Sequence, residues 1–431
     1  MRKSTIASIA SLCMVPALFW SQDSSAVPAF ARKYQTSCYT CHSGFPNRNA
    51  FGEAFKNNGY RWPGGEEEDH AKQEQTKMGA NGWKQTFPET PWPSDIPGFA
   101  PFALAISGPI VNYADQSKYT TGLVKSPQTL NQGGPINPQI LFGGTIGENI
   151  GVVGLVGGLV QGAPTTQIRT TWAFSPGVNL GFGNGFSAFS GLVTPISVYS
   201  SVFPASGTST EFNYTVGKEG GFNLIAGVAS AGTSLSTEEG VTTANTPSNR
   251  LDDTRYVRVK YKLFGAGLLS GAGGTYGNEF VGLDNSLALG ASLVSLREKL
   301  GQSTTTGLAS NYIKGTVNET LVYGADIAGN YGSFTGGVAY SRDQDFKLNN
   351  YAVDAGYYVY PWLLARVKYT DLGVVDGLRN PFWTPSVTAW LRANVSLAAS
   401  YKAFSKNLVP IASGTDYNNA NTFTLTGSLA F

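Results

Sequence analysis

The residues best suited to chemistry in this sequence are Cys38, Cys41 and His42, which form a Cys-x-x-Cys-His motif. Two thiols at this spacing can add to the two vinyl groups of one haem, and the adjacent imidazole can bind the iron. A redox-active or zinc-binding cysteine pair followed by a chance histidine is the alternative interpretation. The sequence contains only three cysteines and two histidines, and the third cysteine, Cys13, lies in the N-terminal leader. This economy favours covalent attachment of one c-type haem.

The motif supplies one axial ligand of the haem iron, and a second ligand has few possible sources. Outside the motif, His70 and Met78 are the mature residues with strong iron affinity. Met78 precedes Gly79, and a loop can bring its sulfur back over the haem. His70 follows the acidic run 66–69, which is typical of a solvated loop and can also concentrate cations near the haem. Met78 is therefore the preferred distal ligand, and His70 or an open site remains an alternative.

The composition excludes some classes of protein. Charged residues make up 13% of the 431 residues and aromatic residues 12%, and the chain has 53 glycines. Aromatic and β-branched residues are spread evenly, which argues against a glycine-rich disordered chain. The net charge of +2 and the absence of a lysine or arginine tract give no indication of nucleic-acid binding.

The first 26 residues read as a secretory signal peptide. Arg2 and Lys3 form its basic start, and residues 6–20 form an apolar run. Ser24-Ser25-Ala26 offers a cleavage site of small residues, and Ala29-Phe30-Ala31 is a second possibility. Export agrees with the haem motif, because bacteria complete this kind of haem attachment outside the cytoplasm.

Residues 27–99 are expected to form a small helical and coil segment around one haem. A short helix is predicted from about Asn47 to Asn58, ending at Gly59. A proline-rich stretch, residues 87–101, is predicted to be a stiff linker to the rest of the chain. The aromatic residues expected to wall the haem pocket are Phe30, Tyr34, Phe45, Phe51, Phe55, Tyr60 and Trp62.

Residues 100–431 consist of segments of about ten residues that alternate apolar and polar side chains, separated by turn residues. The clearest is 255–264, where Arg258, Lys260 and Lys262 alternate with apolar residues. The chain ends on such a segment with a terminal phenylalanine, Phe431, which resembles the signal for insertion of outer-membrane barrels. The prediction is an all-β fold: a transmembrane antiparallel β-barrel of about 16 strands in the bacterial outer membrane.

The alternation also predicts which side chains face lipid and which face the lumen. The apolar side of each strand should face lipid, and Arg258, Lys260, Lys262, Arg366 and Lys368 should face the lumen. A barrel of this size can hold a plug. We expect the haem segment to act as a plug in the lumen or at its periplasmic mouth. The basic residues could then meet haem propionates or acidic residues of the plug, or simply face water.

Several motifs in the first 98 residues resemble the fused monohaem cytochrome c–porin family of bacterial outer membranes. They are residues 28–34, 38–42, 45–46, 49–52, 55–62, 87–88, 92–93 and 96–98. The barrel agrees with this family only in architecture. The resemblance carries over to Cys38, Cys41 and His42 as haem-binding residues, but not to Met78.

The resemblance implies an electron-transfer protein. Known members are iron(II) oxidases that pass electrons from an extracellular donor to a periplasmic c-type cytochrome. The chain would then be an iron(II):cytochrome oxidoreductase working by outer-sphere electron transfer, with covalent haem c as its cofactor. The alternative is a solute-conducting porin whose haem segment is a gate, sensor or structural plug.

Overall fold

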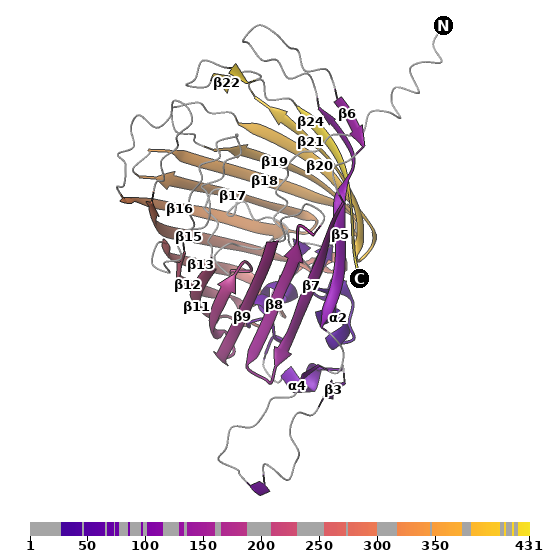
Figure 1. Ribbon diagram of the computed structural model, residues 1–431, viewed down its shortest axis with the longest axis vertical. Coiled ribbons are helices and arrows are strands. Elements are labelled where there is room, and N and C mark those ends of the chain that lie inside the picture. Colours follow the sequence, from indigo (N-terminus) through magenta and orange to yellow (C-terminus); the bar gives the residue numbers. More distant parts are fainter. Residues whose placement is uncertain are drawn as a thin grey trace.

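The alternating segments of the sequence form the wall of a closed antiparallel β-barrel in the computed structural model (Figure 1). Eighteen strand segments follow one another around the barrel. Two of these, β6 and β14, are short segments that do not count as separate wall strands. Next to them, β5 pairs directly with β7, and β13 pairs directly with β15. The wall therefore has 16 strands, as the sequence predicted. The structure describes residues 27–44, 47–64, 67–72, 74–76, 85–86, 96–97, 101–114, 129–132, 136–159, 165–187, 208–230, 254–272, 275–299, 317–344, 347–372, 381–405, 409–410, 416–417 and 421–431.

Most wall strands are between eight and fifteen residues long, which suits tilted strands that cross a bilayer. The strands of the wall are β5 (Phe102–Ala114), β7 (Asn137–Ile146), β8 (Ile150–Gly157), β9 (Thr165–Ser175), β10 (Val178–Asn184), β11 (Thr208–Val216), β12 (Glu219–Ala229), β13 (Thr254–Ala266), β15 (Leu283–Lys299), β16 (Val317–Tyr331), β17 (Phe334–Asp343), β18 (Asn349–Tyr360), β19 (Leu363–Asp371), β20 (Phe382–Arg392), β21 (Val395–Phe404) and β24 (Thr422–Ala430). Shorter strands are β6 (Thr129–Gln132), β14 (Thr275–Asn278), β22 (Val409–Pro410) and β23 (Asp416–Tyr417).

Period-two alternation sorts the side chains of the wall as predicted. On β13, Val257 and Tyr261 are 44% and 53% exposed on the outside, whereas Arg258 and Lys262 are buried on the inside. Trp172 on β9 is likewise exposed on the outer surface. Closure of the barrel leaves no unpaired strand edge, and the apolar exterior is suited to contact with lipid. Strands cross the bacterial outer membrane in this form. Among the described residues, no helix is long and apolar enough to span a bilayer.

The two rims of the barrel differ. Neighbouring strands at one rim are joined by short turns, such as residues 176–177, 332–333 and 361–362. In bacterial barrels the short turns face the periplasm. The barrel closes where β24 pairs with β5, and near this rim the backbone of Phe431 exchanges hydrogen bonds of 2.8 and 2.9 Å with that of Leu104. The predicted terminal strand thus completes the wall.

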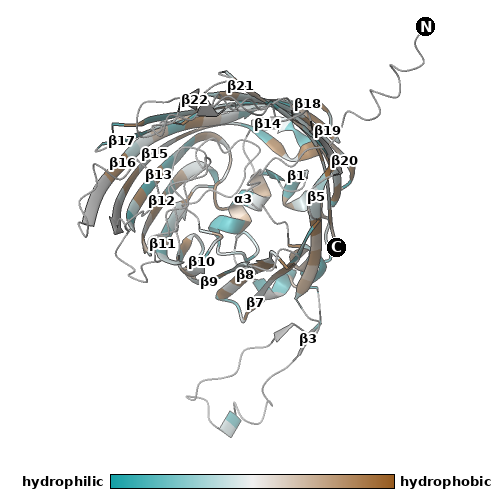
Figure 2. Ribbon diagram, turned by 45° about the horizontal axis from the view of Figure 1, so that its top comes forward, coloured by the Kyte–Doolittle hydropathy of each residue, from teal (hydrophilic) through white to brown (hydrophobic). Residues whose placement is uncertain are grey.

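The N-terminal segment lies inside this wall (Figure 2). We call residues 27–62 the plug. It contains α2 (Pro28–Lys33), the 3-10 helix η1 (Cys38–Thr40), strands β1 (His42–Gly44) and β2 (Asn47–Arg48), and α3 (Ala50–Asn57). Helix α4 (Glu67–His70) follows at the short-turn rim (Figure 1).

Helix α3 begins three residues later than predicted. Asn47 and Arg48 pair with β1 instead, and the side chain of Asn49 caps the helix by accepting from the Gly52 amide at 3.0 Å. The predicted end is correct, since Asn58 caps the C-terminus and Gly59 takes the left-handed conformation with φ 73°.

The plug is fixed to the wall by polar contacts on several sides. The Asn57 side chain donates to the Leu268 carbonyl at 2.8 Å, and the Asn57 carbonyl accepts from Asn179 at 2.9 Å. On the other side, the hydroxyl of Tyr358 donates to Ser43 at 3.0 Å. The loop after β13 and the end of η3 (Glu279–Val281) also pack on the plug, since Gly271 lies against Phe51 and Gly282 against Asn49.

Few residues of the predicted stiff linker, 87–101, are described by the structure; they are 96–97 and Pro101. Strand β4 (Ile96–Pro97) pairs with β3 (Gln75–Thr76). The stiff, extended character of residues 87–101 stays a prediction.

The backbones of plug and wall approach each other closely, and this allows a test of how the plug docks. A methyl group on Gly151 of β8 would collide with the Gly59 carbonyl oxygen. Gly151→Ala should therefore weaken plug docking by about 1–3 kcal/mol, the usual cost of overpacking. Limited proteolysis of the plug at increasing temperature measures this effect. Gly336→Ala on β17 is the control, since its nearest neighbour is 3.6 Å away, and equal proteolysis of both variants would contradict the prediction.

Candidate functional site

A pocket lies between the plug and the wall and brings the chemical motif together with the predicted aromatic residues. Its empty space, counted together with the part that is open to solvent, is about 850 Å³. Cys38, Cys41 and His42 all line it. Barrel residues Val153 and Phe186 complete the lining.

The motif is held in place by local hydrogen bonds. Ser37 caps η1 by accepting from the Tyr39 amide at 3.2 Å. Asn49, besides capping α3, donates from its side chain to the carbonyls of Tyr39 and Thr40 at 2.9 and 3.1 Å. Gly52 lies so close to the Cys41 carbonyl that a larger residue would collide with it. Helix α3 and the motif therefore form one rigid unit.

Both thiols are free of disulfide bonding. Burial raises the pKa of the Cys41 thiol to about 12, and the neighbouring Cys38 adds to the rise. Burial also raises the pKa of Cys38. The raised pKa values favour the protonated thiols at neutral pH, and a thiol can add to a vinyl group.

His42 is oriented by one of its ring nitrogens. Its Nδ1 lies 3.2 Å from the carbonyl oxygen of Asn47, the residue that also starts β2. A carbonyl partner requires the proton on Nδ1, so Nε2 is the ring nitrogen whose lone pair could bind a metal. This arrangement suits a proximal haem ligand.

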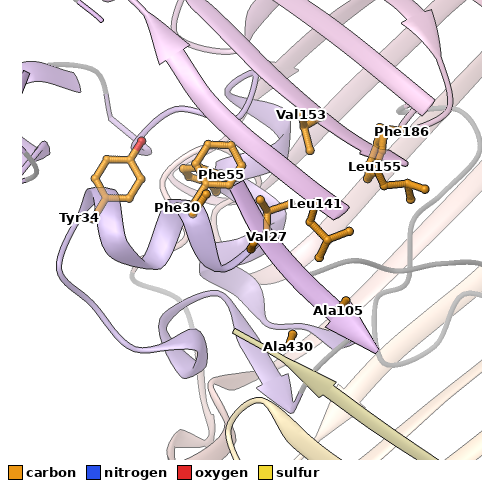
Figure 3. Close-up of a cluster of buried hydrophobic side chains, with 12 residues drawn as sticks. Val27, Phe30, Tyr34, Phe55, Ala105, Leu141, Val153, Leu155, Phe186 and Ala430 are labelled. Atoms are coloured by element: carbon orange, nitrogen blue, oxygen red, sulfur yellow. The ribbon is translucent and has the colours of Figure 1, made fainter. Parts of the chain in front are cut away.

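Aromatic rings form the apolar wall of the pocket. Phe30 from α2 and Phe55 from α3 meet edge to face with ring centroids 5.0 Å apart (Figure 3). Tyr34 and Phe51 each contact Trp62, at 5.0 and 4.9 Å. Tyr60 also lines the pocket, whereas Phe45 lies outside the described residues. Six of the seven aromatic residues singled out from the sequence therefore line this pocket.

The two candidates for the distal ligand have different outcomes. His70 stacks on Trp62 with ring centroids 4.5 Å apart and is not among the residues that line the pocket. A ligand role would require the imidazole to leave that stack. Met78 lies outside the described residues, two positions beyond Thr76 of β3.

A buried polar cluster fixes the first turn of the plug to α4 and the wall. Lys33 pairs with Glu67 and also contacts Thr145 of β7. Glu67 accepts from the Tyr34 hydroxyl at 2.6 Å and from the Trp62 amide at 2.7 Å. Burial and the nearby Glu67 raise the pKa of Tyr34 well above its ordinary value. Because Tyr34 and Trp62 both line the pocket, this cluster positions two of its walls.

The basic residues predicted to face the lumen have distinct partners. Lys260 reaches the plug and pairs with Glu53 at 2.9 Å. Arg258 pairs with Asp326 at 2.6 Å and Lys262 with Asp284 at 2.7 Å, both within the barrel wall. The expected contact between these basic residues of β13 and the plug is therefore made by Lys260. Arg366 also has a wall partner, since it forms a bidentate pair with Asp354.

Sequence reasoning missed several residues of the pocket. Phe186 follows β10 in a left-handed conformation with φ 48°, and its carbonyl accepts from the Tyr60 hydroxyl at 3.2 Å. Arg48 and Lys56 also line the pocket. Gly185, immediately before Phe186, was the only local signal for this turn.

The pocket as built suits a covalently attached haem. Its two thiols can form thioethers, His42 can supply one axial ligand, and the rings can contact the porphyrin faces and edge. Among the described residues that line it there is no carboxylate, and two cations are present. These features suit a flat apolar group that carries anionic substituents.

Comparisons with known proteins find only distant structural likenesses. No known protein family matches this sequence, and no characterised sequence is significantly similar to it. Among solved structures, outer-membrane-expressed OmpT of Vibrio cholerae is 11% identical with a TM-score of 0.43, and 77% of this chain covers 99% of that one. A mutant of the Rh. blastica porin is 10% identical with a TM-score of 0.40, and 77% of this chain covers all of that one. Likenesses this distant carry no argument about function, so the assignment to the outer-membrane β-barrel class rests on the closed wall and apolar exterior described above.

Proposed function

We propose that the chain is an outer-membrane electron-transfer protein with one covalently bound haem c. The donor is extracellular, with iron(II) as the leading candidate, and the acceptor is a periplasmic c-type cytochrome or similar carrier. The observation that carries the proposal is the convergence of Cys38, Cys41 and His42 on one aromatic pocket inside a barrel. When bound, the haem supplies a centre that accepts and releases one electron.

The location of the pocket supports this function. The hydrocarbon layer is about 30 Å thick, which is a long distance for a single redox centre to serve. Val153 lies midway along β8, and Phe186 follows the end of β10 that is remote from the short turns. In this proposal the extracellular donor approaches the redox centre from the outer side of the lumen. The plug residues Asn57 and Asn58 reach the short-turn rim. This would shorten the distance for electron transfer from the haem to the periplasmic acceptor.

The chain's own residues have separate roles in this proposal. Cys38 and Cys41 attach the cofactor, His42 binds the iron on one side, and the aromatic rings exclude water from the porphyrin. Electron transfer between separated centres makes and breaks no bonds, so it requires no general acid or base. The distal ligand remains Met78 in this proposal, with His70 or an open site as the alternatives.

A solute-conducting porin is the second candidate function, because the barrel is closed and its inner face is polar. Contacts between the plug and β7, β10, β11, β13 and β18 argue for an obstructed lumen. Free passage of small sugars in a liposome-swelling assay would favour the porin, and a sealed barrel would favour electron transfer.

One experiment tests the proposed function directly. Oxidised protein is reconstituted in liposomes and mixed with iron(II) outside while the haem absorption bands are followed. Reduction of the haem, followed by reduction of a c-type cytochrome enclosed in the vesicles, is the expected result. Haem that stays oxidised with iron(II) would overturn iron(II) as the donor, and a protein without haem would overturn the proposal as a whole.

The distal ligand gives a spectroscopic prediction. Met78→Ala should abolish the sulfur-to-iron charge-transfer band in the red of the oxidised spectrum, because a thioether ligand produces that band. His70→Ala is the matched control and should leave it intact. Loss of the band only in the His70 variant would contradict the assignment, as would an unchanged band in both.

A further inference from the structure

The two residues that follow His42 are held by the barrel wall. Ser43 is fully buried, and its hydroxyl accepts a hydrogen bond of 3.0 Å from Tyr358 of β18. Gly44 lies against the ring of Trp390 on β20, so closely that a Cβ atom at this position would be 2.5 Å from the ring. Tyr358 and Trp390 are themselves buried and stacked, with ring centroids 6.3 Å apart. The wall therefore fixes β1 directly beside the residue proposed as the proximal haem ligand.

The orientation of the His42 ring depends on how β1 and β2 pair. The ring belongs to β1, and the carbonyl oxygen that lies 3.2 Å from its Nδ1 belongs to Asn47 on β2. The Ser43 hydroxyl lies 3.5 Å from the same carbonyl oxygen. The Asn47 side chain is a further polar neighbour of the Tyr358 hydroxyl. One hydroxyl of the wall thus contacts both strands, and its removal should alter the distance between His42 and its carbonyl partner.

The surroundings of this contact are apolar. Val281 of η3 and Leu364 of β19 join Tyr358 and Trp390 in one buried cluster. A hydrogen bond in such surroundings is electrostatically stronger than one in water, and loss of one partner leaves the other buried and uncompensated. The bond from Tyr358 to Ser43 therefore contributes to holding β1 and β2 in one geometry.

We propose that Tyr358 of the barrel wall is a positioning residue for the proximal haem ligand. The inference rests on the proposed function. The Tyr358 hydroxyl holds β1 against β2, which keeps Nδ1 of His42 on the Asn47 carbonyl. A histidine that donates from Nδ1 to a carbonyl is a more basic metal ligand, and a more basic ligand favours the oxidised iron, which carries the higher charge. The docked barrel thereby lowers the reduction potential of the haem and makes the reduced haem a stronger donor to the periplasmic acceptor.

Tyr358→Phe tests the inference, because it removes the hydroxyl and keeps the buried ring. The variant should shift the equilibrium toward reduced haem by roughly fivefold, the weight of one ordinary hydrogen bond. For a one-electron couple this is about 40 mV toward higher potential. Spectroelectrochemical titration of the purified holoprotein measures the shift.

Tyr340→Phe is the matched control. It removes a tyrosine hydroxyl from the adjacent strand β17, where that hydroxyl donates to Asn349 of the wall at 2.8 Å. Its reduction potential should stay at the wild-type value. An unchanged potential in Tyr358→Phe would overturn the inference, and so would an equal shift in the two variants.

A double variant separates positioning from a general loss of packing. Ser43→Ala removes the other partner of the same contact and should also raise the potential. Because both changes break one hydrogen bond, the double variant Ser43→Ala/Tyr358→Phe should shift the potential by clearly less than the sum of the two single shifts. Fully additive shifts would show that Tyr358 does not act through Ser43 and would overturn the inference.

A second measurement decides the case if a variant cannot be titrated. Photolysis of carbon monoxide from the reduced haem leaves the iron bound to its proximal ligand, and the iron–histidine stretching band then appears in the resonance Raman spectrum. Weaker donation from Nδ1 lowers its frequency, so Tyr358→Phe and Ser43→Ala should both shift the band downward. An unchanged band in both variants would overturn the inference. Wild-type protein that contains no covalent haem would overturn the proposed function instead, so the two failures are distinguishable.

Discussion

Replacing Cys38 and Cys41 together by serine should leave the protein with essentially no haem that survives extraction with acidic acetone. A serine hydroxyl does not add to a vinyl group as a thiol does, so both thioether bonds are lost. The two thiols line one pocket beside His42, and the sequence contains no other cysteine outside the leader. No neighbouring thiol can therefore substitute for them.

The measurement is haem absorption in the protein pellet after extraction, with wild type and Tyr39→Phe as references. Tyr39 lies between the two cysteines and is 39% exposed, so its hydroxyl should not be needed for attachment. The barrel should still resist unfolding by detergent at room temperature, because the wall is closed by its own backbone pairing. Covalent haem in the double serine variant would refute the assignment of the motif.

An empty pocket should also loosen the plug. Phe30, Phe55 and Trp62 line the pocket that the haem would occupy. Loss of the contacts between rings and porphyrin removes apolar burial worth roughly 25 cal/mol per Å². Proteolysis of the plug in the double serine variant should therefore be faster than in wild type. Equal rates would mean that the plug is held by the wall alone.

The barrel was predictable because its signal is local and repeated. Period-two alternation at 255–264 predicted both the strand and the directions of Val257, Arg258 and Lys262, and β13 confirms each. Aromatic residues close to the motif in sequence were also predictable as pocket walls. A segment of this size has few other apolar partners.

The contacts that complete the pocket were not predictable, because they join residues far apart in sequence. Lys260 meets Glu53 across 207 positions, and this depends on where the plug docks and on strand register. The start of α3 was misplaced because Asn47 is held by His42 through its carbonyl, a contact that depends on how β1 and β2 pair. Phe186 turns inward through a left-handed backbone that few residues adopt, and Gly185 was the only nearby residue that indicated a turn.

Replacing Lys260 by glutamate should release the plug and open the barrel to ions. Glu53 of α3 pairs with Lys260 at 2.9 Å, and both side chains are largely buried, at 17% and 21% exposure. The variant places two carboxylates together in a partly dehydrated lumen. Breaking a buried pair in this way costs roughly 3–5 kcal/mol, so the undocked fraction should rise by about a hundredfold or more. Single-channel conductance in planar bilayers should increase accordingly.

Lys262→Glu is the matched control for this variant. Lys262 lies two residues further along the same strand, faces the same lumen, and pairs with Asp284 of the barrel wall. The same change in charge there should disturb the wall locally and leave the plug docked. Equal conductance of the two variants would show that the lumen charge as a whole, and not the contact with Glu53, governs docking.

The dependence on pH follows from the same pair. Burial alone would raise the pKa of the Glu53 carboxyl, but Lys260 and Arg48 hold it below its ordinary range. A carboxyl with a lowered pKa in the docked state stabilises docking at every pH above its ordinary value of about 4.3. That stabilisation is lost as the pH falls from there through the lowered pKa. Wild-type conductance should therefore stay low from pH 7 to about pH 4 and rise below it. The Lys260→Gln variant lacks one partner of Glu53, so its conductance should rise at a higher pH than that of wild type. Identical pH profiles for the two proteins would exclude Glu53 as the docking charge.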